Sequence, residues 1–467
     1  MHIRGVLRAV LVCGMTVQIM LGLAWLVKNM GGLQTFQESR WLLTGGGVAG
    51  RLYSGALYRG LVSLLSSHLR ILYGIQLAAA FASAYGLAAC FMGKDQKALR
   101  ILGALALTFI PQTLQCHLAV LPWSLGTSLL LAQIALWVDL THNRTKEYGR
   151  ERKTVIAMLG SWMLLVCIVP VYAWFSLPLL AAVLWRAGKS GGIKRRVFLG
   201  LTGLAIAVCC MAVNCGFSPS AWNRELAANA LSRTGWPHFQ NDYDSIPEPL
   251  HSEIGLDTAR KVSAYADGVE ISLIPKLEEY YGPEETTSIL WELAGLCLKR
   301  NLRADVKNVI WDMAAYHATP PIFAMQLKGR AYDSHSGINY QQMKNRAPLL
   351  SRRYVTYAAR WWWLMLGLAV ILTGCKLAER VVNPDVRAGK AKAGTPGTCE
   401  GKAKSGTPGA RNFLQSWFPV LAGAEWMILY FVAQGSGIMD YKKTLCVTVL
   451  WYVAALSRLG NREGGEG

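Results

Sequence analysis

The sequence predicts an all-α fold, a polytopic transmembrane helical bundle of about ten spans with one inserted, mostly helical external domain. Two observations lead to this prediction. Long apolar runs recur with short polar breaks, and several approach the roughly 20 residues that cross about 30 Å of hydrocarbon. Basic residues also concentrate in alternate breaks. The pattern is therefore that of an integral membrane protein.

The apolar runs define the predicted spans. The run at 154–186 is long enough for a hairpin of two short helices broken near Pro170, and counting it twice gives ten spans. An even number places both ends of the chain on the same side of the membrane. The runs are 6–27, 71–93, 101–115, 120–140, 154–186, 197–217, 361–378, 413–433 and 444–457.

The basic residues in the polar breaks between apolar runs predict the orientation of the chain in the membrane. Lys and Arg are enriched in cytoplasmic connections, so the breaks that carry them should face the cytoplasm together. Arginines flank the first and last runs as well, and both termini are therefore predicted to be cytoplasmic, in a multi-pass protein of the cell membrane. The basic breaks lie within 94–100, 144–153, 186–196 and 376–411.

The formal net charge of +20 does not indicate a nucleic-acid partner. Residues 218–357 contain 15 Lys plus Arg and 16 Asp plus Glu, so the positive excess lies in the membrane part. There it attracts anionic lipid headgroups. The cysteines lie mostly in apolar runs and form no CxxC pair, which argues against a disulfide framework or a zinc site of that type.

The N-terminal transmembrane module is predicted at 1–217. Its first apolar run lacks a clear small-residue cleavage site and is expected to stay as the first span. The first external loop, 28–70, contains an amphipathic stretch that is expected to lie in the plane of the membrane interface. Its apolar residues at helical spacing are Leu57, Leu61, Leu64 and Leu65.

The external domain is predicted at 218–357 and reads as mostly helical. Pro283 followed by Glu284 and Glu285 indicates a helix start, because Pro suits the first turn and acids favour the positive end of the helix dipole. Two apolar faces are expected downstream. The first comprises Ile289, Leu293, Leu296 and Cys297, and the second Val306, Val309, Ile310 and Met313.

The C-terminal part is predicted as a span at 358–380, a basic cytoplasmic linker at 381–411, and a transmembrane hairpin with a tail at 412–467. The linker contains a duplicated element, Gly389–Gly397 and Gly401–Gly409, rich in Gly, Lys, Pro and Thr. Because this composition has no aromatic residues to bury, the linker is expected to be disordered.

The residues suited to catalysis or phosphate binding concentrate at the predicted external membrane face. Glu38 is the only acid in the first external loop, and Arg40, Arg51 and Arg59 follow it. A carboxylate beside cations at headgroup depth has the chemistry to deprotonate a hydroxyl while the cations hold a lipid phosphate. A simple ion pair between Glu38 and Arg40 or Arg51 is the competing interpretation.

This layout resembles the GT-C membrane glycosyltransferases, within them the polyprenyl-phosphate-sugar-dependent group related to protein O-mannosyltransferases and aminoarabinose transferases. The shared features are a short cytoplasmic N-terminus, a first span, a long external loop with an acid near its start, and an in-plane helix. They cover about residues 1–217 and the final spans. The resemblance implies that Glu38 is a general base or a metal-associated acid, and it leaves a divalent metal open as a cofactor.

The chain departs from that family in the turn between its third and fourth spans. Relatives often carry a second acid there, whereas Gln115–Trp123 contains no carboxylate. His117 is the polar residue that takes its place as a proton-accepting candidate. The interfacial position alone would also explain a histidine.

Weaker candidates for binding a substrate phosphate are Arg352 and Arg353, which precede the Trp361–Trp363 run, and Lys442 in the last external turn. Interfacial Trp and flanking Arg also anchor a span to lipid headgroups, so anchoring is the competing interpretation. The histidines of the external domain show no spacing that suggests a metal site.

The sequence favours a glycosyltransferase that moves a sugar from a polyprenyl-phosphate donor to an external glycan, lipid or protein. Its expected partners are that lipid-linked donor and membrane lipids, without nucleic acid. The alternatives are a non-catalytic membrane protein, either a transporter or an envelope-assembly scaffold, or an inactive relative of the transferases. Transporters usually show two similar halves with broken spans, and this chain shows no such symmetry.

Overall fold

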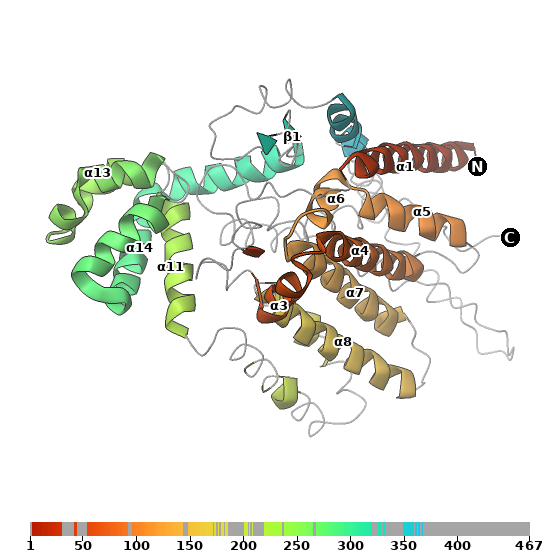
Figure 1. The fold of residues 1–467 in the computed structure, drawn as a ribbon, viewed down its shortest axis with the longest axis horizontal. Coiled ribbons are helices and arrows are strands. Elements are labelled where there is room, and N and C mark those ends of the chain that lie inside the picture. Colours follow the sequence, from red (N-terminus) through yellow and green to blue (C-terminus); the bar gives the residue numbers. More distant parts are fainter. Residues whose placement is uncertain are drawn as a thin grey trace, which may run out of the picture.

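The computed structural model describes most of the chain up to residue 318 and one further helix. The described residues form a helical bundle and, beyond one end of it, a second group of helices (Figure 1). They are 2–29, 42–43, 54–91, 96–142, 148–170, 219–235, 238–264, 268–318, 326–327, 330–331 and 349–358, with single residues and short pieces within 172–184, 200–208 and 360–367.

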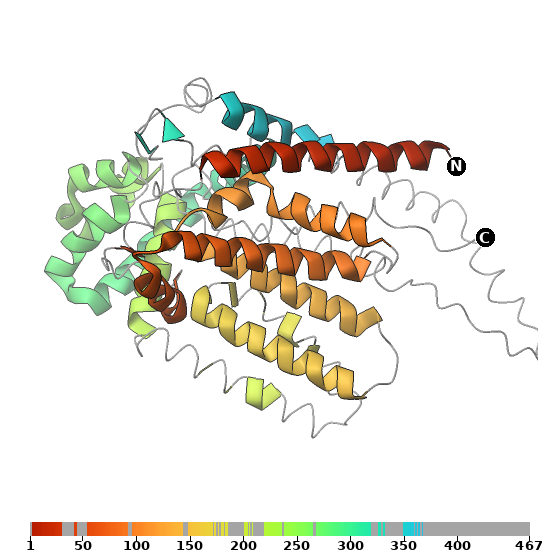
Figure 2. The same cartoon turned by 45° about the vertical axis from the view of Figure 1, so that its right-hand side comes forward.

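The bundle consists of long helices that run back and forth. Short connections join α4 to α5 and α7 to α8, so these neighbours are antiparallel. α4 packs on α5 and α7, α7 packs on α8, and α1 packs on α5. Figure 2 shows them side by side. Their bounds are α1 (His2–Lys28), α4 (Leu69–Phe91), α5 (Lys97–Thr108), α7 (Trp123–His142) and α8 (Tyr148–Ile168).

One end of the bundle carries two short helices, α3 (Ala56–Leu65) and α6 (Pro111–His117). We call it the α3–α6 end, and α4 and α7 begin there while α8 ends there. The opposite end, where α1, α5 and α8 begin, we call the N-terminal end. The two ends are separated by the length of the bundle (Figure 2).

The amphipathic helix predicted within the first external loop, 28–70, is present as α3. Tyr58 and Val62 are buried, whereas Leu57 and Leu64 are exposed. The helix packs on α4 and α8. Gly55 precedes it and lies directly against α8, because its backbone N–H donates to the Ile168 carbonyl at 2.9 Å.

The predicted span at 101–115 is interrupted. α5 has 12 residues, which at 1.5 Å per residue is about 18 Å and well short of a bilayer. Ile110 adopts extended backbone and Pro111 begins α6. Proline has no N–H for a helix interior but fits the first helical position. The chain therefore ends one helix and starts another.

The predicted break near Pro170 is confirmed. α8 ends at Ile168, before Pro170. The Trp162 indole N–H donates to the Ala173 carbonyl at 3.2 Å, which joins the two sides of the break.

Two helices of the described part are long and apolar enough to cross a membrane, Ala9–Lys28 and Leu69–Cys90. In the span-length window of each, 39% of the residues are buried among the described residues. α1 is also integral to the bundle, because the Gln18 amide N–H group donates to the Ala106 and Phe109 carbonyls of the α5 end at 2.9 and 3.0 Å. These helices are consistent with membrane association.

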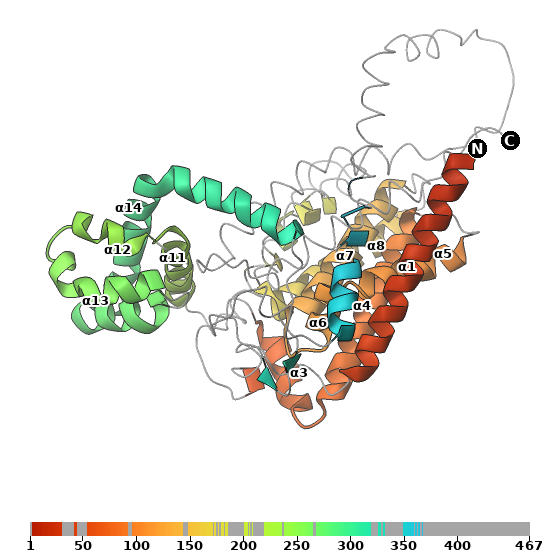
Figure 3. The same cartoon turned by 90° about the horizontal axis from the view of Figure 1, so that it is seen from above.

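The second group of helices, which we call the helical domain, has its own core. Buried side chains of several helices meet there, among them Leu231, Phe239, Leu273, Leu290 and Cys297. It lies on the side of the molecule away from the N-terminus (Figure 3). Its elements are α11 (Pro219–Gly235), α12 (Phe239–Asp242), η2 (Tyr243–Ser245), α13 (Leu250–Ala264), η3 (Val269–Leu273) and α14 (Ile274–Ala318).

The helix start predicted at Pro283 is confirmed. Gly282 interrupts α14 with a φ of 75°, a conformation that suits glycine, and regular helix resumes at Pro283. The apolar face differs slightly from the prediction, because Leu290 is buried and Leu296 only half-buried. Val306, expected on a second apolar face, is 39% exposed.

The described helix at 349–358 belongs to the bundle. Tyr354 and Ala358 are buried in the bundle core, although the sequence placed Tyr354 at the end of the external domain and Ala358 at the start of the following span. Between α14 and this helix lies one antiparallel pair of two-residue strands, β1 (Gln326–Leu327) and β2 (Arg330–Ala331). The predicted linker 381–411 and the hairpin 412–467 lie outside the described residues.

We expect Gly55→Ala to destabilise the protein, because a Cβ there would lie 2.1 Å from the Cys167 carbonyl oxygen. Overpacking of this kind costs about 1–3 kcal/mol. Gly60→Ala, in the same helix, is the matched control. A Cβ at Gly60 meets nothing within 4 Å, and alanine should raise helix stability by about 0.5–1 kcal/mol. Thermal unfolding of the purified chain in detergent measures both, and a neutral Gly55→Ala would contradict the packing of α3 on α8.

Candidate functional site

α6 is a short helix enclosed by its neighbours. Pro111 and residues 113–121 are all buried, and α6 packs on α1, α4, α5 and α7. Its last carbonyls have no partners within the helix, so other groups must satisfy them. The side chain that does so at the end of α6 is Gln76 of α4, and it defines the candidate site.

Gln76 of α4 is the central residue of this site. Its amide N–H group donates to the His117 carbonyl at 2.8 Å and to the Ala119 carbonyl at 3.0 Å. Its amide oxygen accepts a hydrogen bond from the Tyr58 hydroxyl at 3.2 Å. One fully buried side chain thus joins α3, α4 and the end of α6.

His117 lies at the end of α6 and is 1% exposed. Its Nδ1 is 2.6 Å from the Ser124 hydroxyl of α7, so one of the two donates to the other. Burial lowers the pKa of His117 from 6.5 to about 3, because a charged imidazole would lose its hydration. The imidazole is therefore neutral at neutral pH, and its Nε2 is buried without a partner.

Tyr58 remains a neutral hydroxyl donor. Burial, followed by the nearby Tyr73 and Cys116, raises the pKa of Tyr58 well above its usual value. The network Tyr58–Gln76–His117–Ser124 therefore contains only neutral side chains. Such an arrangement can hydrogen-bond an uncharged group, and the free imidazole nitrogen can accept or donate one proton.

Arg59 follows Tyr58 on α3 and lies at the edge of this network. The side chain is half-buried, and its guanidinium donates to the Ser54 carbonyl at 2.7 Å. A cation at headgroup depth was predicted here from the sequence. The structure adds that α3 holds it beside buried neutral residues.

Arg352 and Arg353 lie elsewhere at this end of the molecule. Their helix packs on α1, where the Trp25 indole N–H donates to the Ser351 hydroxyl at 3.0 Å. Arg352 is half-buried and Arg353 exposed. Figures 1 and 2 show this helix and α3 on opposite sides of the bundle.

Four sequence-predicted site residues lie outside the described residues: Glu38, Arg40, Arg51 and Lys442. Sequence reasoning missed Gln76 and Ser124. A signal for Gln76 was available, because an amide in the middle of an apolar run must find partners inside the protein.

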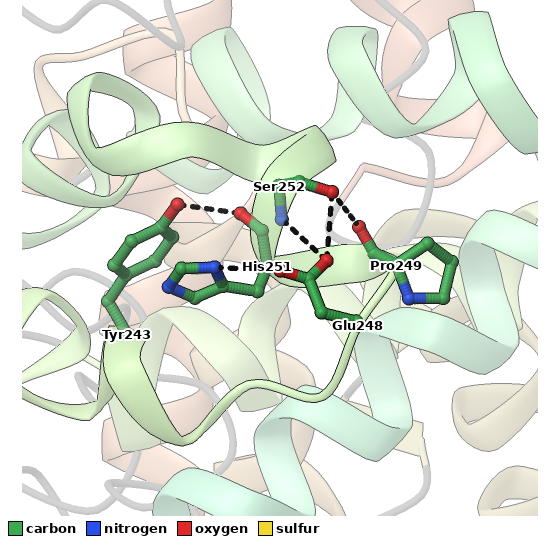
Figure 4. A network of polar contacts seen from close by, with 5 residues as sticks. All are labelled: Tyr243, Glu248, Pro249, His251 and Ser252. Atoms are coloured by element: carbon green, nitrogen blue, oxygen red, sulfur yellow. Dashed lines mark hydrogen bonds and ion pairs between the residues drawn. The ribbon is translucent and has the colours of Figure 1, made fainter.

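The helical domain contains a second polar cluster around Glu248 and His251 (Figure 4). Glu248 accepts hydrogen bonds from the Ser252 hydroxyl at 2.8 Å and the Ser252 backbone N–H at 3.2 Å, and its carboxylate lies 3.2 Å from His251. The Ser252 hydrogen bonds lower the pKa of Glu248. His251 also stacks on Tyr243, with ring centroids 4.2 Å apart.

This cluster has a structural explanation. Glu248 lies just before α13 and places a carboxylate on its first turn, which satisfies a free N–H and suits the helix dipole. Among the described residues no group of three or more His, Cys, Asp or Glu side chains is placed to hold a metal ion. The α3–α6 end is therefore the better candidate site.

Comparisons of the chain with family models, with curated proteins and with solved structures found no match.

The buried His117 predicts a pH dependence of stability. Its folded pKa of about 3 lies below the unfolded value of 6.5, so the unfolded chain binds more protons and stability falls as pH drops from about 6.5 towards 3. Between pH 7 and 5 this loss is about 2 kcal/mol. His117→Asn, which can keep a contact to Ser124, should remove that share of the pH dependence. Chemical unfolding of both proteins at pH 7, 6 and 5 measures it, and parallel curves would show that His117 titrates normally.

Proposed function

We propose that this chain is a multi-pass membrane glycosyltransferase that transfers a sugar from a polyprenyl-phosphate donor to an external glycan, lipid or protein. The observation that carries the proposal is the composition of the α3–α6 end. It combines an amphipathic helix bearing Arg59, a buried neutral imidazole, and the adjoining helical domain.

Membrane insertion of the bundle is supported by its inverted polarity. Exposed positions carry large apolar side chains, among them Met20, Val27, Ile71, Ile156 and Leu164. Fully buried positions include amides that a water-soluble bundle usually leaves at its surface, namely Gln18, Gln76 and Gln133. A hydrocarbon environment explains both at once, because it favours apolar outer faces and requires polar groups to turn inwards.

The basic residues support the orientation. α5 begins at Lys97, and Arg150, Arg152 and Lys153 lie in the first turns of α8. Cations at a helix N-terminus oppose the helix dipole by about 0.3–1 kcal/mol each, so helix stability does not explain them. Anionic cytoplasmic headgroups do. The N-terminal end is thus cytoplasmic, and the α3–α6 end and the helical domain are external, within the predicted ten-span topology.

The proposed roles follow from this placement. Glu38 belongs to the segment that connects α1 to α3, and both helix ends that it joins lie at the α3–α6 end. As general base, Glu38 takes the proton of the acceptor hydroxyl. The oxygen of that hydroxyl forms a bond to the sugar, and the bond from the sugar to the polyprenyl phosphate breaks so that the phosphate leaves. Arg59, with Arg40 and Arg51, holds the donor phosphate. The helical domain selects the acceptor.

We expect Glu38→Gln to lower transfer by about 10²–10⁴-fold, the usual contribution of a positioned general base. Arg59→Ala should instead weaken binding of the donor, because a hydrogen bond to a charged group contributes about 1.5–3 kcal/mol. Membranes containing each variant are assayed with a labelled polyprenyl-phosphate sugar over a range of donor concentrations. Arg260→Ala is the matched control, since Arg260 is exposed on the helical domain.

The non-catalytic alternatives predict a different result in the same assay. A scaffold or an inactive relative gives no transfer with any donor in a panel of polyprenyl-phosphate sugars, although the chain is folded. A wild-type chain without activity across that panel would remove the enzyme proposal. Full activity of Glu38→Gln would remove only the assignment of the base.

A further inference from the structure

Several buried polar atoms at the α3–α6 end have no hydrogen-bond partner. The five side chains that carry them are each at most 3% exposed, and they come from the turn before α3 and from α4, α6 and α7. The atoms are Ser54 Oγ, Tyr73 Oη, Thr113 Oγ1, His117 Nε2 and Thr127 Oγ1. Buried polar atoms are normally paired, so these five atoms require an explanation.

These atoms lie close to the Gln76 network along each helix. Residues three or four positions apart share a helix face. Tyr73 is one turn from Gln76, Thr113 is one turn from His117, and Thr127 is one turn from Ser124. The His117 carbonyl accepts a hydrogen bond from Gln76 of α4, and the His117 imidazole contacts Ser124 of α7. The faces of α4 and α7 that carry Tyr73 and Thr127 therefore both adjoin the end of α6.

The chemistry of this set is neutral. It consists of four hydroxyls and one imidazole nitrogen, each able to donate or accept a hydrogen bond. It contains no carboxylate that would favour a cation. The set itself contains no cation that would hold a phosphate. Arg59, which donates to the Ser54 carbonyl, is not one of its members. Burial keeps the His117 imidazole uncharged by lowering its pKa to about 3.

We propose that these five side chains form a binding site for an uncharged group that carries several hydroxyls, namely a pyranose ring. The choice of a sugar over other polyhydroxylated compounds rests on the proposed function, in which the ring is the sugar of the lipid-linked donor. A ring with hydroxyls on several carbons supplies paired donors and acceptors to the unpaired atoms. The phosphate of the same donor then lies toward Arg59, outside this neutral set.

The unpaired hydroxyls of the ligand-free protein give the test. Thr113→Val and Thr127→Val replace an unpaired buried hydroxyl by a methyl group of similar size. Each should raise the melting temperature of the ligand-free protein, because an unsatisfied buried hydroxyl is removed. Each should also weaken sugar binding about tenfold, since one hydrogen bond to the ligand is lost. A gain in stability with a loss of binding is the expected signature of a binding residue.

The experiment uses the full-length chain in a detergent without a sugar headgroup. Methyl mannopyranoside and methyl glucopyranoside are titrated with saturation-transfer NMR as the readout, and inorganic phosphate serves as the charged comparison. Thr108→Val is the matched control. Thr108 is 4% exposed, but its hydroxyl donates to the Ala104 carbonyl at 2.9 Å, so its loss should not raise stability or alter sugar binding.

Three results would overturn the proposal. The first is the absence of saturable binding of either glycoside. The second is a lower melting temperature of both threonine variants, which would show that buried water or another group already satisfies the hydroxyls. The third is unchanged sugar affinity in both variants. Binding that behaves as expected in a chain without transfer activity would instead refute only the proposed function.

Discussion

The bundle depends on one constraint: polar groups enclosed by apolar helices must find their partners inside the protein. The Gln76 side chain shows how this is met. Its N–H group donates to two carbonyls, one at the end of α6 and one just beyond it. Its oxygen accepts a hydrogen bond from the Tyr58 hydroxyl. One amide therefore fixes α3 and α6 on α4. The N–H group of Gln18 likewise satisfies two carbonyls at the end of α5 and joins that end to α1. An unpaired amide in such surroundings costs several kcal/mol, which makes these contacts decisive for where the short helices lie.

This constraint explains why the candidate site is buried and uncharged. Holding α6 inside the bundle removes water from His117, which keeps the imidazole neutral and leaves its Nε2 without a partner. The same contact to Tyr58 places Arg59 one residue further along α3, at the edge of the buried network. A neutral interior beside a cation is therefore a direct result of how the helices are joined. The proposed division of the donor into a sugar within the network and a phosphate near Arg59 uses this arrangement.

Much of the helical pattern was predictable from local signals. The amphipathic spacing of Leu57 and Leu64 predicted α3, and Pro283 with two following acids predicted the restart of α14 after Gly282. The depth of α6 was not predictable, because the apolar run at 101–115 gives no sign that Pro111 starts a second helix enclosed by four others. His117 was expected at the interface for the same reason. The helix at 349–358 is held in the bundle by contacts to Trp25 and Phe109, both far away in the sequence. Arg352 and Arg353 belong to this helix and therefore lie apart from Arg59.

The central claim is that the bundle lies in a membrane with its apolar faces toward lipid. Nitroxide labels at Met20→Cys on α1 and Leu164→Cys on α8 test it most directly in a chain whose other cysteines are replaced. Both positions are exposed, at 65% and 46%, as is Leu256 on the helical domain at 42%. In lipid vesicles the labels at Met20 and Leu164 should collide with oxygen and not with a water-soluble nickel chelate, and a label at Leu256→Cys should show the reverse. Equal access of the nickel chelate to all three positions would contradict the claim.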